Sequence, residues 1–449
     1  MTSLFSHIAP SEELPNSRLV HQPGSVIGSS ALIAGTTVGA GILALPAVTF
    51  PAGVIPSTVL MVAVWLYMVI SGLLIAEVNL QAMRQSGQPT IGLLATIRGS
   101  LGNGGAIASG ILYLFIHYAL LIAYVARGGD LLAEGLQSLA NTLGLTFSVP
   151  LWAGHVVFSV VFGGLLYFGR DRTISKINTT LVAIVVITFV GLLSLTLRQT
   201  HPAQLAYQNW HALSTAIPVI VVAFVYHNVV PVVTTQLEGD GTKVRQAILI
   251  GAAVPLVMFI AWNAVILTSV DVGVEALNLA IIDPIELLRK GDGFPGLGTL
   301  VSVFSEGAIA TSFIGFVFGL LNFFQDLFSQ LPSSFPAESD TSNPRETESP
   351  IFSLGASKKS LLYGLVFLPP LALSVVSPTI FFSAIDFAGA FGNSILFGVI
   401  PAVMAWQWRS QFPSMARPLV PGGKITLTVM IGCAIAVICQ NILIKSQLI

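Results

Sequence analysis

Two short stretches decide how this chain folds: GTTVGAG at residues 35–41 and FVYHNVVP at residues 224–231. Each lies near the middle of a long apolar run, and polar side chains gather at both places. Glycine favours non-helical backbone and an internal proline removes a backbone hydrogen bond, so both stretches weaken a continuous helix. We therefore predict a broken helix at each position. A GxxxG packing motif at Gly35 and Gly39, or a simple kink at Pro231, is the alternative interpretation.

The composition around these stretches is that of an integral membrane protein. Of 449 residues, 54% are hydrophobic and only 9% are charged, against roughly 25% charged in an ordinary globular chain. Mean hydropathy is +0.85. The formal net charge of −1 gives no basic footprint for nucleic acid, so we expect no DNA or RNA partner.

Apolar runs long enough to cross a bilayer recur along the whole chain. A bilayer core of about 30 Å requires about 20 mostly apolar residues per helix. A β-barrel would show short alternating segments instead, so the predicted class is all-α. The sequence predicts eleven spans, at about residues 26–50, 54–82, 106–127, 150–169, 176–197, 212–237, 244–268, 299–328, 360–378, 380–407 and 425–445.

The distribution of basic residues predicts the orientation. With the amino terminus inside, most of the 19 Lys and Arg residues fall in cytoplasmic segments, as the positive-inside rule requires. We therefore expect the amino terminus inside and the carboxyl terminus outside. Residues 1–25 are polar and read as a cytoplasmic tail.

The two predicted breaks lie five helices apart. Because five is odd, two five-helix halves must enter the membrane from opposite sides, which predicts an inverted repeat with a binding site at its interface. The halves would be residues 26–198 and 199–407, with a peripheral eleventh helix in residues 408–449. The second half would contain an extracellular loop at residues 269–297, with a short helical piece interrupted by proline, and a disordered cytoplasmic linker at residues 332–358.

Motifs for nucleotide or metal chemistry are missing from the sequence. It contains no Walker A, HExxH or CxxC pattern, which sets aside an ATP-driven pump and gives no reason to expect a cofactor. Cys433 and Cys439 fall on different helix faces and are expected to pack as small apolar residues. A channel and a membrane-embedded enzyme are the rival functions. A channel needs a ring of selectivity groups and a metalloenzyme needs clustered ligands, and the sequence predicts paired breaks instead.

Four segments of this sequence resemble a known family. They are SALIAGTTVGAGILALPAVTFPAG (residues 30–53), AYVARGGDLL (123–132), FVYHNVVP, and AIATSFIGFVFGLLNFFQDLF (308–328). They are similar to helices 1, 3, 6 and 8 of the hydroxy and aromatic amino acid permeases, the bacterial tryptophan/tyrosine permease family of the amino acid/polyamine/organocation superfamily. The resemblance implies a leucine-transporter-like fold and proton-coupled uptake of an aromatic amino acid by a multi-pass protein of the bacterial cytoplasmic membrane.

The predicted substrate site lies at the two breaks. A break in helix 1 creates a half-helix amino terminus whose free N–H groups suit an α-carboxylate, while carbonyls freed before the break suit an ammonium group. Aromatic side chains near the breaks would surround the substrate side chain; packing in the core or against lipid is the alternative. The predicted substrate-binding residues are Thr36, Thr37, Gly39, Ala40, Gly41, Tyr124, Phe224, Tyr226, His227 and Asn228.

Two accounts of ion coupling stay open at this point. For protons, His227 titrates nearest to neutral pH and lies beside the second break. Buried acids are further candidates because ionisable groups at membrane depth are costly. For sodium, Thr311 and Ser312 resemble the hydroxyl pair with which sodium-coupled relatives of this fold bind the ion. The coupling candidates are His227, Thr311, Ser312, Glu77, Glu306 and Asp386, and no other metal site or protein partner is predicted.

Overall fold

The computed structural model describes residues 24–87, 90–146, 148–269, 283–290, 296–329, 356–377, 380–412 and 418–446. Within these ranges every regular element is a helix, and ten helices plus one bent pair are long and apolar enough to cross a membrane. The all-α class and the expected eleven spans are therefore confirmed. Residues 1–23, 270–282 and 330–355 lie outside the described ranges, and with them most of the predicted tail, extracellular loop and linker.

The first helix is broken where the sequence predicts it. Helix α1 (Val26–Thr37) begins at Ser25, whose hydroxyl accepts a hydrogen bond from the Gly28 N–H. Helix α2 (Gly41–Thr49) follows at an angle of 56°. Val38 still donates to the Ala34 carbonyl, but the helical hydrogen bonding stops at Gly39, so backbone groups are freed in the middle of the span.

The second predicted break is also present. Helix α7 (Ile217–Ala223) ends before Phe224, and a short 3-10 turn, η4 (His227–Val229), leads into α8 (Val230–Gln236). Pro231 lies in the first turn of α8, where its missing N–H costs no helical bond. It therefore starts a new helix and does not merely kink a continuous one.

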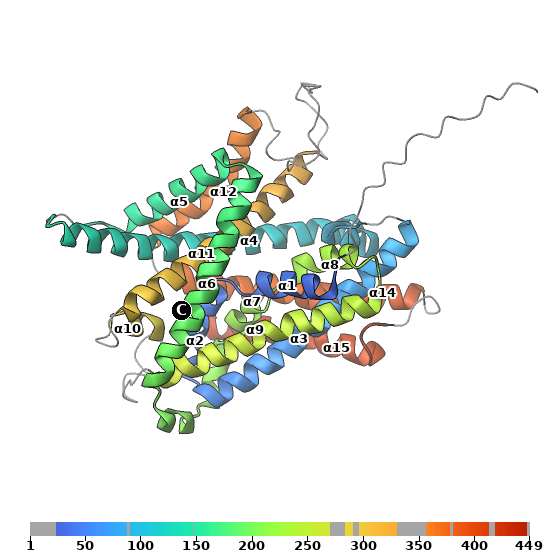
Figure 1. The fold of residues 1–449 in the computed structure, drawn as a ribbon. Coiled ribbons are helices and arrows are strands. Elements are labelled where there is room, and N and C mark those ends of the chain that lie inside the picture. Colours follow the sequence, from blue (N-terminus) through green and yellow to red (C-terminus); the bar gives the residue numbers. More distant parts are fainter. Residues whose placement is uncertain are drawn as a thin grey trace, which may run out of the picture.

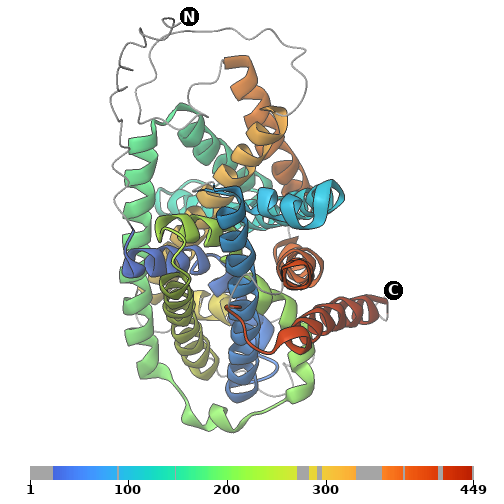
Figure 2. The same cartoon turned by 90° about the vertical axis from the view of Figure 1, so that its right-hand side faces the viewer.

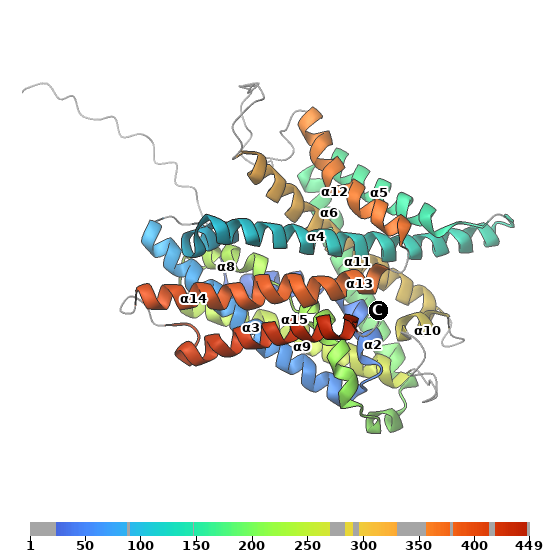
Figure 3. The same cartoon turned by 180° about the vertical axis from the view of Figure 1, so that it is seen from behind.

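Around these broken helices lie long spans, shown from three sides in Figures 1, 2 and 3. Helix 1 is α1 with α2, helix 6 is α7 with α8, and α15, the least buried span, is helix 11. Short 3-10 turns η1 (Leu197–Gln199), η2 (Pro202–Ala206) and η3 (Trp210–Thr215) lead into α7. The other elements are α3 (Val54–Ser86), α4 (Leu93–Thr142), α5 (Leu151–Phe168), α6 (Asp171–Thr196), α9 (Gly241–Ser269), α10 (Pro284–Lys290), α11 (Leu297–Ser329), α12 (Ala356–Val376), α13 (Ile380–Phe387), η7 (Ala388–Val399), α14 (Ile400–Gln411) and α15 (Gly423–Ser446).

Two predicted spans are present but differ from the prediction in length or in local geometry. The span predicted at 106–127 belongs to α4, which joins a short helix to a long one at Gly102, where φ is +69°. From residue 103 to 142 the helix is roughly 60 Å long, about twice the bilayer core. The span predicted at 380–407 lies within a single span, Ile380–Gln411, and contains the π-helix η7, in which Gly389 lies against the backbone carbonyl of Pro218. A side chain could not fit at Gly389.

The two broken helices lie inside the bundle. Figure 1 shows α1, α2 and α7 near the centre, with α10 at one end of the bundle and α8 and the end of α14 toward the other. Helix α1 packs against α9, α2 against α7, and α7 against η7. The freed backbone groups therefore face other helices and not lipid, which is the condition for irregular backbone at membrane depth.

Candidate substrate cavity

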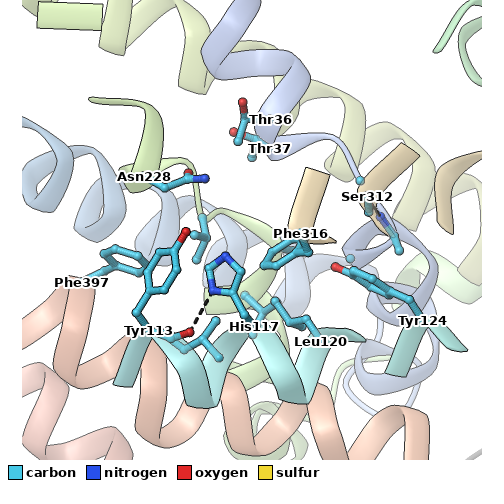
Figure 4. A pocket seen from close by; sticks show the side chains of 17 residues that line it. Thr36, Thr37, Tyr113, His117, Leu120, Tyr124, Asn228, Ser312, Phe316 and Phe397 are labelled. Carbon is cyan, nitrogen blue, oxygen red and sulfur yellow. Dashed lines mark hydrogen bonds between the residues drawn. The ribbon is translucent and has the colours of Figure 1, made fainter. Parts of the chain in front are cut away.

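A cavity lies where the two breaks face α4 and α11 (Figure 4). Its walls come from both halves of helix 1, the break of helix 6, α4, α11 and η7. Seven of the ten predicted substrate-binding residues line it, together with Ser312. The lining residues are Thr36, Thr37, Gly39, Ala40, Gly41, Tyr113, Ile116, His117, Leu120, Tyr124, Val222, Ala223, Val225, Asn228, Ser312, Phe316 and Phe397.

Free backbone N–H groups face this cavity at the start of α2. The Ala40 N–H donates to the Ser312 hydroxyl across 2.9 Å. Among the described residues, the N–H groups of Gly39 and Gly41 donate no hydrogen bond. The positive end of a helix dipole and two unused donors together suit an anionic group.

The two glycines are required by packing against other helices. A β-carbon at Gly39 would collide with the Ser312 hydroxyl, and one at Gly41 would lie 3.0 Å from the Cα of Ala223 at the end of α7. By contrast, a β-carbon at Gly35 would meet nothing within 4 Å. Gly39 and Gly41 therefore let helices 1, 6 and 8 meet at the breaks.

Aromatic rings form the wall opposite the breaks. His117 stacks on Tyr113 with ring centroids 3.8 Å apart and lies 5.0 Å from the ring of Phe316. The rings of Tyr124 and Phe316 meet edge to face at 5.7 Å. Phe397 of η7 lines the same space. This wall suits a flat apolar group with a polar atom at its edge.

One side of the cavity is open. Asn228 of η4 lines the cavity and is exposed, and Gly35, which precedes the lining residues Thr36 and Thr37 on α1, is also exposed. The hydroxyls of Thr36 and Thr37 donate back to carbonyls of their own helix, each across 2.8 Å. The opening therefore lies beside α1 and η4, the segments that precede the first break and follow the second.

Three predicted substrate-binding residues do not line the cavity. Phe224 packs on Phe259 with centroids 5.1 Å apart, and the Tyr226 hydroxyl donates to the Met68 carbonyl across 3.2 Å. His227 is fully buried between the rings of Tyr226 and Phe397, at 4.8 and 4.7 Å. Neither nitrogen of His227 makes a hydrogen bond of normal geometry among the described residues, although the backbone of Met68 lies close to the ring.

Five cavity residues of α4 follow a signal that the sequence contains. Starting from Tyr124 and moving back by three or four residues at a time gives Leu120, His117, Ile116 and Tyr113. This spacing places side chains on one face of a helix. Only Tyr124 was predicted, although the same period would have found the others.

The remaining coupling candidates lie apart from the lining residues. Thr311 donates to the Ala308 carbonyl of its own helix across 3.1 Å. Glu306 has a buried carboxylate oxygen without a hydrogen-bond partner among the described residues. Glu77 pairs with Arg409 through two hydrogen bonds of 2.8 and 2.9 Å, and Asp386 pairs with Lys445 at 2.8 Å.

An ion-pair cluster holds the short helix α10 against α4. Arg127 of α4 contacts Asp283 at 2.8 Å and Glu286 at 3.5 Å. Arg289 of α10 pairs with Glu134. Burial raises the pKa of the Asp283 carboxyl, although the Arg127 charge acts in the opposite direction. The cluster ties α10 to the end of the bundle at which it lies in Figure 1.

Comparisons with known proteins match this architecture over nearly the whole chain. A sequence profile of the tryptophan/tyrosine permease family matches residues 22–335 and 351–440. A tryptophan-specific transport protein of Haemophilus influenzae is 28% identical over 419 residues, covering 89% of this chain and 91% of the relative. A tyrosine-specific transport system 2 of the same organism is 27% identical, with 92% and 95% covered. A tryptophan-specific transport protein of Pseudomonas aeruginosa is 28% identical, with 92% and 94% covered.

Proposed function

Because this chain belongs to the tryptophan/tyrosine permease family, we propose that it imports an aromatic amino acid across the bacterial cytoplasmic membrane by alternating access, coupled to protons. Family members are transport proteins, not enzymes. The observation that carries the proposal is the cavity in which two broken helices face a wall of aromatic rings.

The helix ends at the breaks complement an amino acid zwitterion. The α-carboxylate would accept hydrogen bonds from the N–H groups of Gly39 and Gly41 at the start of α2. The carboxyl-terminal ends of α1 and α7 present carbonyl groups and the negative end of each dipole to the ammonium group. The substrate is thereby held without a buried formal charge on a protein side chain.

The aromatic wall supplies the subsite for the substrate side chain. Tyr113, Tyr124, Phe316 and Phe397 offer ring faces and edges to an indole or a phenol. Such ring pairs contribute about 0.5–1.5 kcal/mol each beyond the area they bury. The names of the relatives, which specify tryptophan and tyrosine, agree with this chemistry.

Helix packing supports the inverted repeat. If helices 1–5 correspond to helices 6–10, a contact between two helices is expected to recur between their two counterparts. Helix α1 packs on α9 and α7 packs on α3, which is the first such pair. Three further contacts have counterparts. The contact of α4 with α5 corresponds to that of α11 with α12, and the contact of α4 with α13 corresponds to that of α11 with α6. The contact of α6 with α9 corresponds to that of α14 with α3. Four pairs of contacts therefore follow the predicted correspondence, whereas the packing of α4 on α12 has no comparable counterpart between α11 and α5 in the described part of the chain.

The open side of the cavity supports an inward-facing state. With the amino terminus inside, α1 and α8 are the cytoplasmic halves of helices 1 and 6, and the exposed Gly35 and Asn228 lie beside them. The ion pairs of α10 with α4 would close the outer end at the same time. One open end and one closed end is the arrangement that alternating access requires.

Hydrogen bonding at α11 favours protons over sodium. The Ser312 hydroxyl accepts from Ala40, and the Thr311 hydroxyl donates to its own helix. A sodium ion would take a lone pair of each hydroxyl oxygen, and Ser312 already uses one of its two lone pairs to accept from the Ala40 N–H. The titratable groups that we propose for proton coupling are the buried His227 and Glu306, which has a buried carboxylate oxygen without a hydrogen-bond partner among the described residues.

Proteoliposome assays test the proposal. We expect exchange of labelled for unlabelled tryptophan or tyrosine, and accumulation driven by a pH gradient without sodium. A panel of the twenty amino acids defines the substrate, and protein-free liposomes are the control. Passive flux without exchange would indicate a channel. A folded, reconstituted protein that exchanges no aromatic amino acid would refute the proposal.

A further inference from the structure

His117 is the imidazole in the aromatic wall of the cavity, whose other polar atoms are the hydroxyls of Tyr113 and Tyr124. Its side chain is 5% exposed and lines the cavity between Tyr113 and Phe316. Ile116, which directly precedes it, and Leu120, one turn further along α4, line the same cavity. The proposed carboxylate and ammonium contacts lie at the two breaks, so the zwitterion does not account for an imidazole here.

The hydrogen bonding of the ring fixes its neutral tautomer. His117 Nδ1 lies 2.8 Å from the carbonyl oxygen of Tyr113. A carbonyl can only accept, so Nδ1 carries the hydrogen, and Nε2 of the neutral ring is left with a lone pair. Among the described residues, Nε2 makes no hydrogen bond.

The free nitrogen faces the cavity. Figure 4 shows Nδ1 joined to Tyr113 and the other ring nitrogen pointing away from α4, toward the side on which Thr36 and Thr37 lie. Gly319 of α11 makes room for this edge of the ring, because a β-carbon there would lie 2.8 Å from Nε2. The Nε2 acceptor is therefore held in one position by the hydrogen bond to the Tyr113 carbonyl, by stacking on the Tyr113 ring and by the space at Gly319.

We infer that His117 Nε2 accepts a hydrogen bond from the substrate side chain, from the indole N–H of tryptophan or the phenol O–H of tyrosine. The inference rests on the proposed function and deepens it. It assigns to His117 the selection of aromatic amino acids that carry a ring donor over phenylalanine, which has none. A ligand whose ring has no hydrogen-bond donor would bury His117 Nε2 without a partner. The cost of desolvating Nε2 would then weaken the binding of that ligand.

Ligand pairs that differ in the donor alone test this inference. Tryptophan is compared with 3-benzothienylalanine, an isostere whose ring sulfur replaces the N–H, and tyrosine is compared with phenylalanine. The measurement is competition against labelled tryptophan with the purified full chain. We expect the wild type to prefer each donor ligand by about tenfold or more.

Substitutions locate the effect at residue 117. In His117→Leu the preference is expected to fall to within about twofold, through weaker binding of the donor ligands, with the affinity for phenylalanine little changed. His117→Gln retains an acceptor near the same position and is expected to keep part of the preference. The wild-type comparison needs no variant and so remains decisive if His117→Leu does not fold.

The outcomes separate the two proposals. A wild type that binds tryptophan and its isostere equally, or a His117→Leu variant that keeps the full preference, would overturn the role of His117 and leave aromatic amino acid transport intact. A folded wild type that binds no aromatic amino acid would overturn the proposed function, and the inference with it.

Discussion

Gly39 lies against Ser312, and this contact gives a prediction that can be worked out quantitatively. Gly39→Ala places a methyl group where the Ser312 hydroxyl lies. The hydroxyl must move, and the Ala40 N–H then loses the acceptor that it has at 2.9 Å. Because Ala40 is fully buried, an unpaired donor there costs about 1–3 kcal/mol. We expect Gly39→Ala to destabilise the protein by about 2 kcal/mol.

A double-mutant cycle isolates this contact. Ser312→Ala removes the same hydrogen bond and should cost a similar amount. Adding Gly39→Ala to Ser312→Ala should cost little more, because the new methyl would lie 3.5 Å from the β-carbon of residue 312. The coupling energy is therefore expected to be about 1–2 kcal/mol.

The assay is unfolding of the detergent-solubilised protein, with and without tryptophan. Gly35→Ala is the matched control, since a β-carbon there meets nothing within 4 Å. It should be neutral or stabilising by up to about 1 kcal/mol. Additive losses in the double mutant, or a Gly35→Ala variant as damaged as Gly39→Ala, would refute the reasoning.

Three further predictions concern ionisable residues. Arg409→Gln leaves the carboxylate of Glu77 buried without its ion-pair partner and should destabilise the protein by about 3–5 kcal/mol. In the same unfolding and binding assays, the ratio of tryptophan affinity to tyrosine affinity should not change. An altered ratio would place this ion pair at the substrate site. Arg127→Gln should increase hydrogen exchange of α10 most at neutral pH, and less as the pH falls through the raised pKa of Asp283, since the protonated carboxyl no longer needs a countercharge. Asp283→Asn should leave hydrogen exchange of α10 near the wild-type level. Equal effects of the two variants would contradict the argument that the buried Asp283 charge needs Arg127. His227→Gln removes the charge change at the second break and should preserve counterflow while reducing pH-driven accumulation; full accumulation would eliminate His227 as the coupling residue and leave Glu306 to be tested.

Helix breaks were predictable because their cause is local. Glycines in residues 35–41 and Pro231 act on the backbone at their own positions, so the sequence alone indicates where hydrogen bonding stops. Helix ends set by tertiary contacts were not predictable in this way. The predicted span at 106–127 stops where charged residues begin, yet α4 continues because Asp130 and Glu134 find partners in His155 and Arg289. Those partners lie on other elements, which no local pattern identifies.

The aromatic residues of the cavity were missed for a geometric reason. Phe224 and Tyr226 adjoin the second break in sequence, but a break changes the direction of the chain and with it the direction of each side chain. Tyr226 therefore packs into the space left by Gly72 of α3, away from the cavity. A regular helix keeps its faces, so the periodic residues of α4 were the more reliable guide.

Gly39 and Gly41 show why a correctly predicted residue does not establish its predicted role. The sequence argument assigns both glycines to the approach of a carboxylate, and both do line the cavity. The structure adds a second requirement, because Ser312 and Ala223 occupy the space that a side chain would need. A bulky substitution at Gly39 would therefore abolish binding whether or not a carboxylate binds there. The two explanations, a packing conflict and a lost carboxylate contact, are separated only by a change that removes the packing conflict, as Ser312→Ala does for Gly39→Ala. If the double mutant binds substrate again, the loss in Gly39→Ala was due to packing. If binding is still lost, the loss was due to the carboxylate contact.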